Sequence, residues 1–231
     1  EYDPATSIDV NVTGTANIFM AARDAGVERV VFASSSSVYG DSEKLPKKEG
    51  EEGKPLSPYA FSKAAGEKMA EVFGKCFAIR LIGLRYFNVY GARQNPEGPY
   101  AAVIPRFFKA YLGGEPPVIY GDGEQSRDFT YVDNVIRANL LALTAPPEAF
   151  GRVYNIAGGS PVKVNELAAI IGKICGREDL KPVHEPPRQG DVAHSEADLE
   201  NAGMIGYAGG TTIRQGLEKA APYYKELYRP R

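Results

Sequence analysis

The sequence is poor in the residues that build disulfide frameworks and metal centres. Its 231 residues include only two cysteines, two histidines and no tryptophan. Cys76 and Cys175 form no Cys-x-x-Cys pair, so we expect them to be reduced, buried thiols in a cytoplasmic protein. His184 and His194 have no cysteine or histidine companion at ligand spacing, and we therefore expect no metal site.

The sequence also lacks an excess of either charge and any long apolar run. The chain has 27 basic and 29 acidic residues, which give a net charge of −2. This balance predicts no basic face, so nucleic acid is not an expected partner. No apolar run approaches the roughly 20 residues of a membrane helix, so we expect no membrane partner either. A hydrophobic share of 43% is typical of an ordinary soluble globular protein.

One short stretch, Tyr59-Ala-Phe-Ser-Lys63, combines two side chains that can move a proton together. Ser57 suits a helix cap and Pro58 the first helical position, so the stretch is expected to open a helix. Residues four apart share a helix face, which places the Tyr59 hydroxyl and the Lys63 ammonium in one site. A fixed positive charge favours a phenolate, so the pair can take a proton from an alcohol and return it. An exposed tyrosine beside a solvated lysine is the alternative, which the spacing alone leaves open.

Apolar patterns alternate between strands and helices along the chain. They predict helices at 7–25, 58–73, 102–112, 133–144, 164–175 and 212–228, and buried strands at 29–33, 79–86 and 153–157. This alternation is typical of an α/β fold with a doubly wound parallel sheet. Ser34-Ser-Ser-Ser-Val-Tyr-Gly40 comes directly after the first strand, where such sheets bind ligands. A plain flexible turn is the alternative for these serines.

Three segments together carry a family resemblance: Ser34–Gly40, Tyr59-x-x-x-Lys63 and Arg85-Tyr-Phe-Asn-Val-Tyr-Gly91. The chain resembles the extended short-chain dehydrogenase/reductases of the NAD-dependent epimerase/dehydratase family, closest to the UDP-glucose/UDP-N-acetylglucosamine 4-epimerase branch. Further matches, which extend the resemblance over essentially all 231 residues, are Asn11–Thr15, Ala101–Phe107, Gly121–Asp128, Tyr154–Gly158 and Arg188–Asp191.

The chain departs from the family pattern in one respect. The family opens with a glycine-rich turn, Gly-x-x-Gly-x-x-Gly, that receives the dinucleotide pyrophosphate at a helix N-terminus, and no such pattern occurs here. We therefore expect that roughly 75 to 85 residues of the cofactor half are absent, as estimated from the missing strand–helix units. Strand 29–33 should then lose a neighbour and expose an edge.

The resemblance implies an isomerase that uses NAD. Tyr59 would act as acid/base on the sugar 4-hydroxyl, with Lys63 favouring its phenolate and holding the nicotinamide ribose. Ser35 would bridge the substrate oxygen and the tyrosine, and Ser36 would be a weaker helper. Residues implied to bind the cofactor are Asn11, Ser34, Tyr59, Lys63, Tyr86 and Phe87, with core packing as the alternative for the last two.

The resemblance also implies a set of residues that bind a UDP-sugar. Arg127 and Arg188 would grip the diphosphate, since the guanidinium offers a permanent charge and a bidentate fork. Asn88 would bind phosphate, and Asp191 would accept from the ribose. The remaining candidates are Val103, Ile119, Tyr120 and Ser195. Ile119 and Tyr120 would line the uracil slot mostly through their backbone, and Ser195 would lie beside the C2 substituent of the sugar.

These implications define the expected organisation and activity. Residues 1–91 and 129–158 would form the second half of the NAD-binding Rossmann domain, and 92–128 and 159–231 a smaller α/β nucleotide-sugar domain. The expected reaction is 4-epimerisation of a UDP-hexose (UDP-glucose/galactose or UDP-N-acetylglucosamine/galactosamine) through a 4-keto sugar, in a homodimer. The alternatives are an epimerase acting on a UDP-uronate and a non-catalytic fragment that binds nucleotide sugars.

Overall fold

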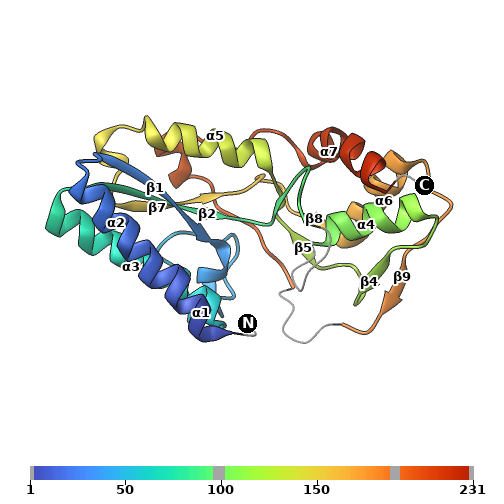
Figure 1. Ribbon diagram of the computed structural model, residues 1–231. Coiled ribbons are helices and arrows are strands. Elements are labelled where there is room, and N and C mark those ends of the chain that lie inside the picture. The colour runs from blue at the N-terminus through green and yellow to red at the C-terminus, as the bar shows by residue number, and fades with distance from the viewer. Residues whose placement is uncertain (1–2, 96–101, 188–192, 229–231) are drawn as a thin grey trace. The chain divides into compact units, whose positions relative to one another are not determined.

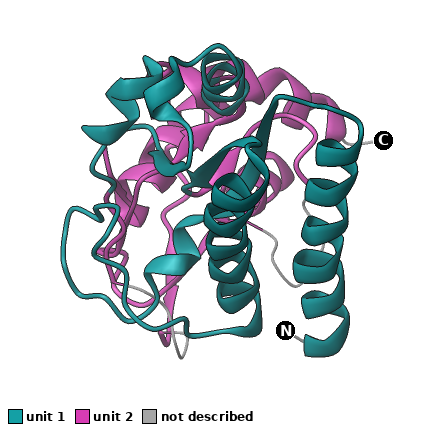
Figure 2. Ribbon diagram, turned by 90° about the vertical axis from the view of Figure 1, so that its left-hand side faces the viewer, with its two compact units in different colours: residues 1–87, 134–159, 197–209 teal, residues 88–133, 160–196, 210–231 magenta. Residues whose placement is uncertain are grey.

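The computed structural model describes residues 3–95, 102–187 and 193–228, and these divide into two compact units (Figure 2). Unit 1 consists of Glu1–Phe87, Asn134–Gly159 and Ala197–Gly209, and unit 2 of Asn88–Asp133, Ser160–Glu196 and Gly210–Arg231. The predicted domain boundaries separate an NAD-binding part from a nucleotide-sugar-binding part, and this functional division of the chain stays a prediction.

Unit 1 is built on a three-stranded parallel sheet. Its strands are β1 (Arg29–Ser35), β2 (Arg80–Tyr86) and β7 (Arg152–Ile156), in the spatial order β1-β2-β7. The predicted α/β class with a parallel sheet is confirmed. Among the described residues β1 pairs with β2 alone, so it is an edge strand of this sheet.

The serine run does not lie wholly after the first strand, as had been predicted. Ser34 pairs with Arg85 and Ser35 with Tyr86, so β1 extends two residues further than the apolar pattern indicated. The ladder to β2 continues because backbone pairing does not depend on the polarity of the side chains.

Helices cover both faces of this sheet (Figure 1). They are α1 (Pro4–Ile8), a π-helix (Asp9–Thr13), α2 (Gly14–Asp24), α3 (Pro58–Phe77), α5 (Val132–Leu143) and 3-10 helices at Ser36–Tyr39, Pro147–Ala149 and Asn201–Ile205. Side chains of α2 and α3 pack with Leu81 of β2 on one face. Those of α5 pack with Ile82 and Leu84 on the other, as the alternation of side chains along a strand requires.

The segment 197–209 belongs to unit 1 because it is anchored to the sheet. Ala202, Ile205 and Tyr207 are buried in the same cluster as α5. The Asn155 amide of β7 donates to the carbonyl oxygens of Lys47 and Asp198, at 2.8 and 3.0 Å. Segments far apart in sequence thus share one core.

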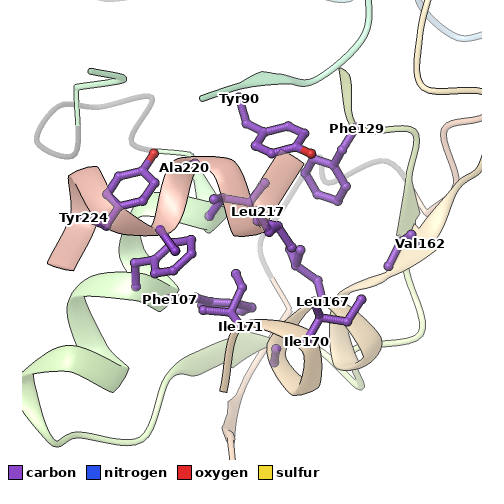
Figure 3. Packing of buried hydrophobic residues seen from close by; sticks show 14 of the residues in the cluster. Tyr90, Phe107, Phe129, Val162, Leu167, Ile170, Ile171, Leu217, Ala220 and Tyr224 are labelled. Atoms are coloured by element: carbon purple, nitrogen blue, oxygen red, sulfur yellow. The ribbon is translucent and has the colours of Figure 1, made fainter. Parts of the chain in front are cut away.

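In the described part of the chain, unit 2 is organised around three helices and short strands. They are β3 (Val89–Tyr90), α4 (Val103–Gly113), β4 (Val118–Tyr120), β5 (Ser126–Arg127), β6 (Thr130–Tyr131), β8 (Val162–Lys163), α6 (Val164–Cys175), β9 (Val183–Glu185) and α7 (Ile213–Leu227). Figure 3 shows Leu217, Ala220 and Tyr224 of α7 facing the aromatic and aliphatic side chains of the core. Tyr224 stacks on Phe108 with ring centroids 4.6 Å apart, so aromatic packing holds α4 and α7 together.

The six predicted helices are all present, but one is irregular. Residues 4–24 are helical with a π-helix at Asp9–Thr13 in the middle, where the pattern had predicted one regular helix. The apolar spacing of 7–25 predicted a regular helix and gave no indication of this turn, whose backbone hydrogen bonds join residues five apart.

The prediction of buried cysteines was wrong for Cys76. This thiol is exposed on α3, four residues after Val72, whose side chain is 56% exposed on the same face. Cys175 is half-buried, and its burial raises the pKa of the thiol to about 11. Both thiols are free. No described helix is both long and apolar enough to cross a membrane.

Candidate functional site

Tyr59 and Lys63 lie in the first two turns of α3, as predicted. The Ser57 hydroxyl caps the helix by accepting from the Ala60 N–H at 3.1 Å, and Pro58 occupies its first position. The Lys63 Nζ lies 5.7 Å from the centroid of the Tyr59 ring. The two side chains therefore share one face, and Tyr59 is 41% exposed at the surface of unit 1.

Lys63 is fixed to the end of β1. Its Nζ donates to the carbonyl oxygen of Ala33 at 3.1 Å. Burial lowers the pKa of the Lys63 ammonium, because the charged form loses contact with water. This bond uses one of the three donors of the ammonium.

Ser35 and Ser36 lie where β1 ends, two and three residues after Ala33. Ser35 is the last residue of β1, and its hydroxyl accepts from the Ser37 N–H at 3.2 Å, which caps the 3-10 helix Ser36–Tyr39. This short helix packs against α3. The carboxyl end of β1 and the first turns of α3 thus carry Ser35, Tyr59 and Lys63.

Asn11 is tied to the turn that carries the tyrosine. Its side-chain amide donates to the Ser62 hydroxyl at 3.1 Å, and that hydroxyl donates to the carbonyl oxygen of Tyr59 at 2.7 Å. Asn11 lies in the π-helix, a feature found frequently at functional sites. The irregular turn thus places Asn11 beside α3.

The other candidates of unit 1 are more buried. The Tyr86 hydroxyl exchanges hydrogen bonds with the Asn139 amide of α5, at 2.9 and 3.2 Å between the heavy atoms. Phe87 is 0% exposed and packs with Val38 and Tyr39. Core packing, the alternative left open, therefore describes the Phe87 side chain, and its cofactor role stays a prediction.

A buried ion pair that sequence reasoning missed joins α3 to the central strand β2. Glu67 of α3 accepts from Arg85 of β2 through both carboxylate oxygens, at 2.8 and 2.7 Å. Arg85 is 2% exposed and also pairs with Glu52 at 2.5 Å. Burial alone would lower the pKa of Arg85, but the hydrogen bonds and charge of Glu67 outweigh it and raise that pKa.

A signal for this pair was present in the sequence. Arg85 follows the apolar run Leu81-Ile-Gly-Leu84 within a strand, and a fully buried arginine requires an acidic partner. Glu67 stands one helical turn after Lys63 and was available as that partner. The strand pattern indicated the burial, but only the structure shows which of the acidic residues is the partner.

The predicted substrate residues of unit 2 gather partly around β5. The Asn88 amide donates to the carbonyl oxygen of Asp128 at 3.1 Å, and Asn88 has a positive φ of 36°. Arg127 donates to the carbonyl oxygens of Ser126 and Ala193, at 2.9 and 3.3 Å. The chain at 193–195 thus runs beside β5.

Ser195 lies in this segment and is bonded to Ser126, the residue before Arg127. Its N–H donates to the Ser126 carbonyl at 3.0 Å, and the Nδ1 of His194 lies 2.9 Å from the Ser126 hydroxyl. Ser195 is half-buried. The predicted residues Arg188 and Asp191 lie outside the described residues.

The remaining candidates of unit 2 lie on α4 and β4. Val103 is the first residue of α4 and is half-buried. Ile119 is 1% exposed in the core, whereas Tyr120 is half-buried with the Arg106 guanidinium 5.6 Å from its ring centroid. The buried side chain of Ile119 leaves its backbone as the part that can meet a ligand. In the described ranges, no group of three or more histidines, cysteines and carboxylates is placed to hold a metal ion.

Comparisons with known proteins agree on one family. The model of the NAD dependent epimerase/dehydratase family matches residues 1–157. The UDP-glucose 4-epimerase of Mycolicibacterium smegmatis is 35% identical over 225 residues, which are 96% of this chain and 71% of that protein. The structure of the Thermotoga maritima UDP-glucose 4-epimerase with UDP-glucose is similar at a TM-score of 0.91 and 35% identity, covering 98% of this chain and 72% of the other. The UDP-N-acetylglucosamine 4-epimerase from Methanobrevibacter ruminantium in complex with UDP-N-acetylmuramic acid gives a TM-score of 0.90 at 37% identity, covering 95% and 70%.

Removal of the Glu67 carboxylate should destabilise unit 1. Glu67→Ala leaves the buried Arg85 without its bidentate partner, so we expect a loss of about 3 kcal/mol in the free energy of unfolding. Glu71→Ala is the matched control, because Glu71 lies one turn further along α3 and pairs with the exposed Lys75. Its unfolding free energy should barely change. Urea unfolding of both variants measures the difference, and equal midpoints would show that the buried pair contributes little.

Proposed function

Because the chain belongs to the NAD dependent epimerase/dehydratase family, we propose that it serves in the NAD-dependent 4-epimerisation of a UDP-hexose. The membership of this family that the sequence motifs indicated is confirmed. The observation that carries the proposal is the placement of Tyr59 and Lys63 on one face of α3, with Lys63 bonded to Ala33 of β1, two residues before Ser35.

In this proposal, the chain's own residues move a proton at the sugar 4-hydroxyl. Tyr59 takes the proton of the 4-hydroxyl as the alcohol is oxidised, and it returns this proton to the 4-oxygen when the rotated 4-keto sugar is reduced on its other face. Ser35 orients the 4-oxygen toward the phenol, and Ser36 assists. The Lys63 ammonium stabilises the negative charge on the phenolate oxygen.

The residues of unit 1 fit NAD as the cofactor. When bound, NAD supplies the acceptor and the donor of the C4 hydride. Lys63 uses one donor on Ala33, and its other two can hold the nicotinamide ribose. Asn11, Tyr86, Phe87 and the backbone of Ser34 complete the cofactor contacts in this proposal.

The substrate is held by residues of unit 2. Arg127 and Arg188 bind the diphosphate, Asn88 a phosphate oxygen and Asp191 the ribose, while Val103, Ile119 and Tyr120 line the path of the nucleoside and sugar. Support comes from the position of Arg127, whose chain neighbours Asp128 and Ser126 accept hydrogen bonds from Asn88 and Ser195 through their carbonyl oxygens.

Epimerisation is favoured over dehydration by the residues after Ser35. Elimination across C5 and C6 needs an acid that can protonate a leaving hydroxyl, and the chain has Ser36 and Ser37 there. A serine hydroxyl is too weak an acid for this step. Epimerisation of a UDP-uronate is the second candidate, because it uses the same proton transfer at C4.

We further propose a cytoplasmic homodimer. Large apolar side chains are exposed on the helical segment 4–24 and on α3, with exposed fractions of 63% for Val10 and Ile18, 55% for Phe61 and 56% for Val72. Such a set of exposed apolar side chains favours a protein interface. The two helical segments would pair with those of a second copy as a four-helix interface.

The first prediction about the proposed function concerns Tyr59 as the acid/base. Tyr59→Phe should lower kcat by about 10²–10⁴, because a positioned proton-transfer group is lost while the ring still packs. UDP-sugar affinity and the unfolding midpoint should stay close to those of the wild type. Tyr223→Phe, on α7, is the control and should keep full turnover. Near-wild-type kcat in Tyr59→Phe would remove this residue from the mechanism.

A second prediction concerns sugar selectivity. Serine at position 195 is small enough to leave room for an N-acetyl group, so Ser195→Tyr should lower kcat/KM for UDP-N-acetylglucosamine far more than for UDP-glucose. A single methylene group too many or too few in a pocket changes kcat/KM by about 10- to 200-fold, so the larger tyrosyl side chain should change the ratio by at least about tenfold. Steady-state kinetics with both substrates measures the ratio, and an equal drop would show that Ser195 is not the gate.

A third prediction tests the dimer. Ile18→Glu combined with Val72→Glu should convert the dimer to monomers, because charges buried without partners are costly. Leu140→Glu on α5, where the side chain is 61% exposed, is the matched control and should leave the dimer intact. Light scattering gives the mass directly. A wild-type monomer at high concentration, or an unchanged mass in the double variant, would contradict the proposal.

A further inference from the structure

The hydroxyl of Ser34 points into unit 1 and binds a carboxylate there. Ser34 is 3% exposed and donates to Oε1 of Glu67 at 2.5 Å. This hydroxyl is therefore engaged inside unit 1, whichever ligand the backbone of Ser34 meets.

Two consecutive residues of β1 thereby bind two consecutive turns of α3. Ala33 accepts from Lys63 through its carbonyl oxygen, and Ser34 donates to Glu67 through its side chain. Lys63 and Glu67 are four residues apart on the helix, so they lie on one face. The peptide group between Ala33 and Ser34 is therefore held to α3 by a hydrogen bond on each side of it, and these two bonds fix the position of the Ala33 carbonyl.

Arg85 makes Glu67 a rigid anchor for this connection. Its guanidinium holds both oxygens of Glu67, and Arg85 is itself paired with Ser34 in the β1–β2 ladder. Glu52 binds the same guanidinium, and the Tyr39 ring lies 4.9 Å from it. A bidentate pair in a buried site leaves the carboxylate little freedom to rotate.

We propose that Ser34 is a positioning residue, which acts through Glu67 and the Ala33 carbonyl to hold the Lys63 ammonium in place. Its effect on turnover rests on the proposed function of Tyr59 and Lys63. The geometric coupling itself, from the Ser34 hydroxyl to Lys63, does not depend on the substrate.

The distinction from a purely structural role follows from what Ser34→Ala leaves intact. The variant keeps both Arg85–Glu67 hydrogen bonds and loses only the connection to β1. Global stability should therefore change little. The ammonium becomes less well fixed, and a misplacement of a catalytic group by about 1 Å can cost on the order of 10²-fold in rate.

The chain offers a matched control three residues away. The Ser37 hydroxyl is buried and makes no hydrogen bond to any described residue. Ser37→Ala thus removes the same group from a neighbouring buried position without breaking a connection. Ser34→Thr keeps the hydroxyl and suits a strand, so it serves as the rescue variant.

The experiment compares these three variants with the wild-type holoenzyme by steady-state kinetics, urea unfolding and lysine acetylation at a fixed pH. Acetylation of Lys63 is quantified by peptide mass spectrometry relative to Lys68, whose side chain is 84% exposed. We expect Ser34→Ala to lower kcat about tenfold or more with little change in KM. In the same variant, the acetylation of Lys63 relative to Lys68 should become faster. Ser34→Thr and Ser37→Ala should resemble the wild type in all three measurements.

Three outcomes would overturn the proposal: a kcat of Ser34→Ala equal to that of Ser37→Ala, an unchanged relative labelling of Lys63, or a lower urea midpoint with faster labelling of all lysines. The last result would make Ser34 a structural residue only. If the wild type converts no UDP-sugar, the proposed function fails, and the Lys63 labelling alone decides whether Ser34 positions this lysine.

Discussion

The buried ion pair between Arg85 and Glu67 is the interaction on which the arrangement of unit 1 depends. Arg85 is the last residue but one of the central strand β2, and Glu67 lies near the middle of α3, so the pair joins the sheet to the helix that carries Tyr59 and Lys63. A charge buried in a core is costly unless it is paired and hydrogen-bonded. The pair therefore specifies one arrangement of β1, β2 and α3, and with it the place where Lys63 meets Ala33.

This arrangement places the proposed proton-transfer residues on a regular scaffold. The helix supplies Tyr59 and Lys63 at a fixed spacing, and the parallel strand supplies Ser35 at its carboxyl end. Side chains held on helices and strands are placed more accurately than those on loops. The candidate residues of unit 2, in contrast, are held by backbone contacts of short strands, such as those between Ser126 and the segment 193–195.

Much of the fold could be predicted from the sequence because local patterns carry it. The strand 79–86 and the helix 164–175 are marked by apolar periodicity and by flanking glycines or prolines, and both lie where the pattern indicated. The Ser57 cap and Pro58 likewise fixed the start of α3. Patterns of this kind depend on neighbours along the chain, which the sequence displays directly.

The features that were missed depend on contacts between distant segments. The extension of β1 through Ser35 follows from its pairing with β2, and the π-helix around Asn11 lies against α3, a contact between segments far apart in the sequence. The exposure of Cys76 depends on which face of α3 meets the sheet. The choice of Glu67 as the partner of Arg85 brings together residues 18 apart in sequence, and periodicity gives no information on such pairs.

The most direct test of the account is the fate of the C4 hydrogen during turnover in deuterated water. The NAD-loaded enzyme is incubated with a UDP-hexose, and the sugar is followed by NMR. Because the hydride leaves C4 and returns to C4 within the bound complex, inversion at C4 should occur without deuterium entering that carbon. Absence of inversion, or inversion with solvent deuterium at C4, would contradict the account.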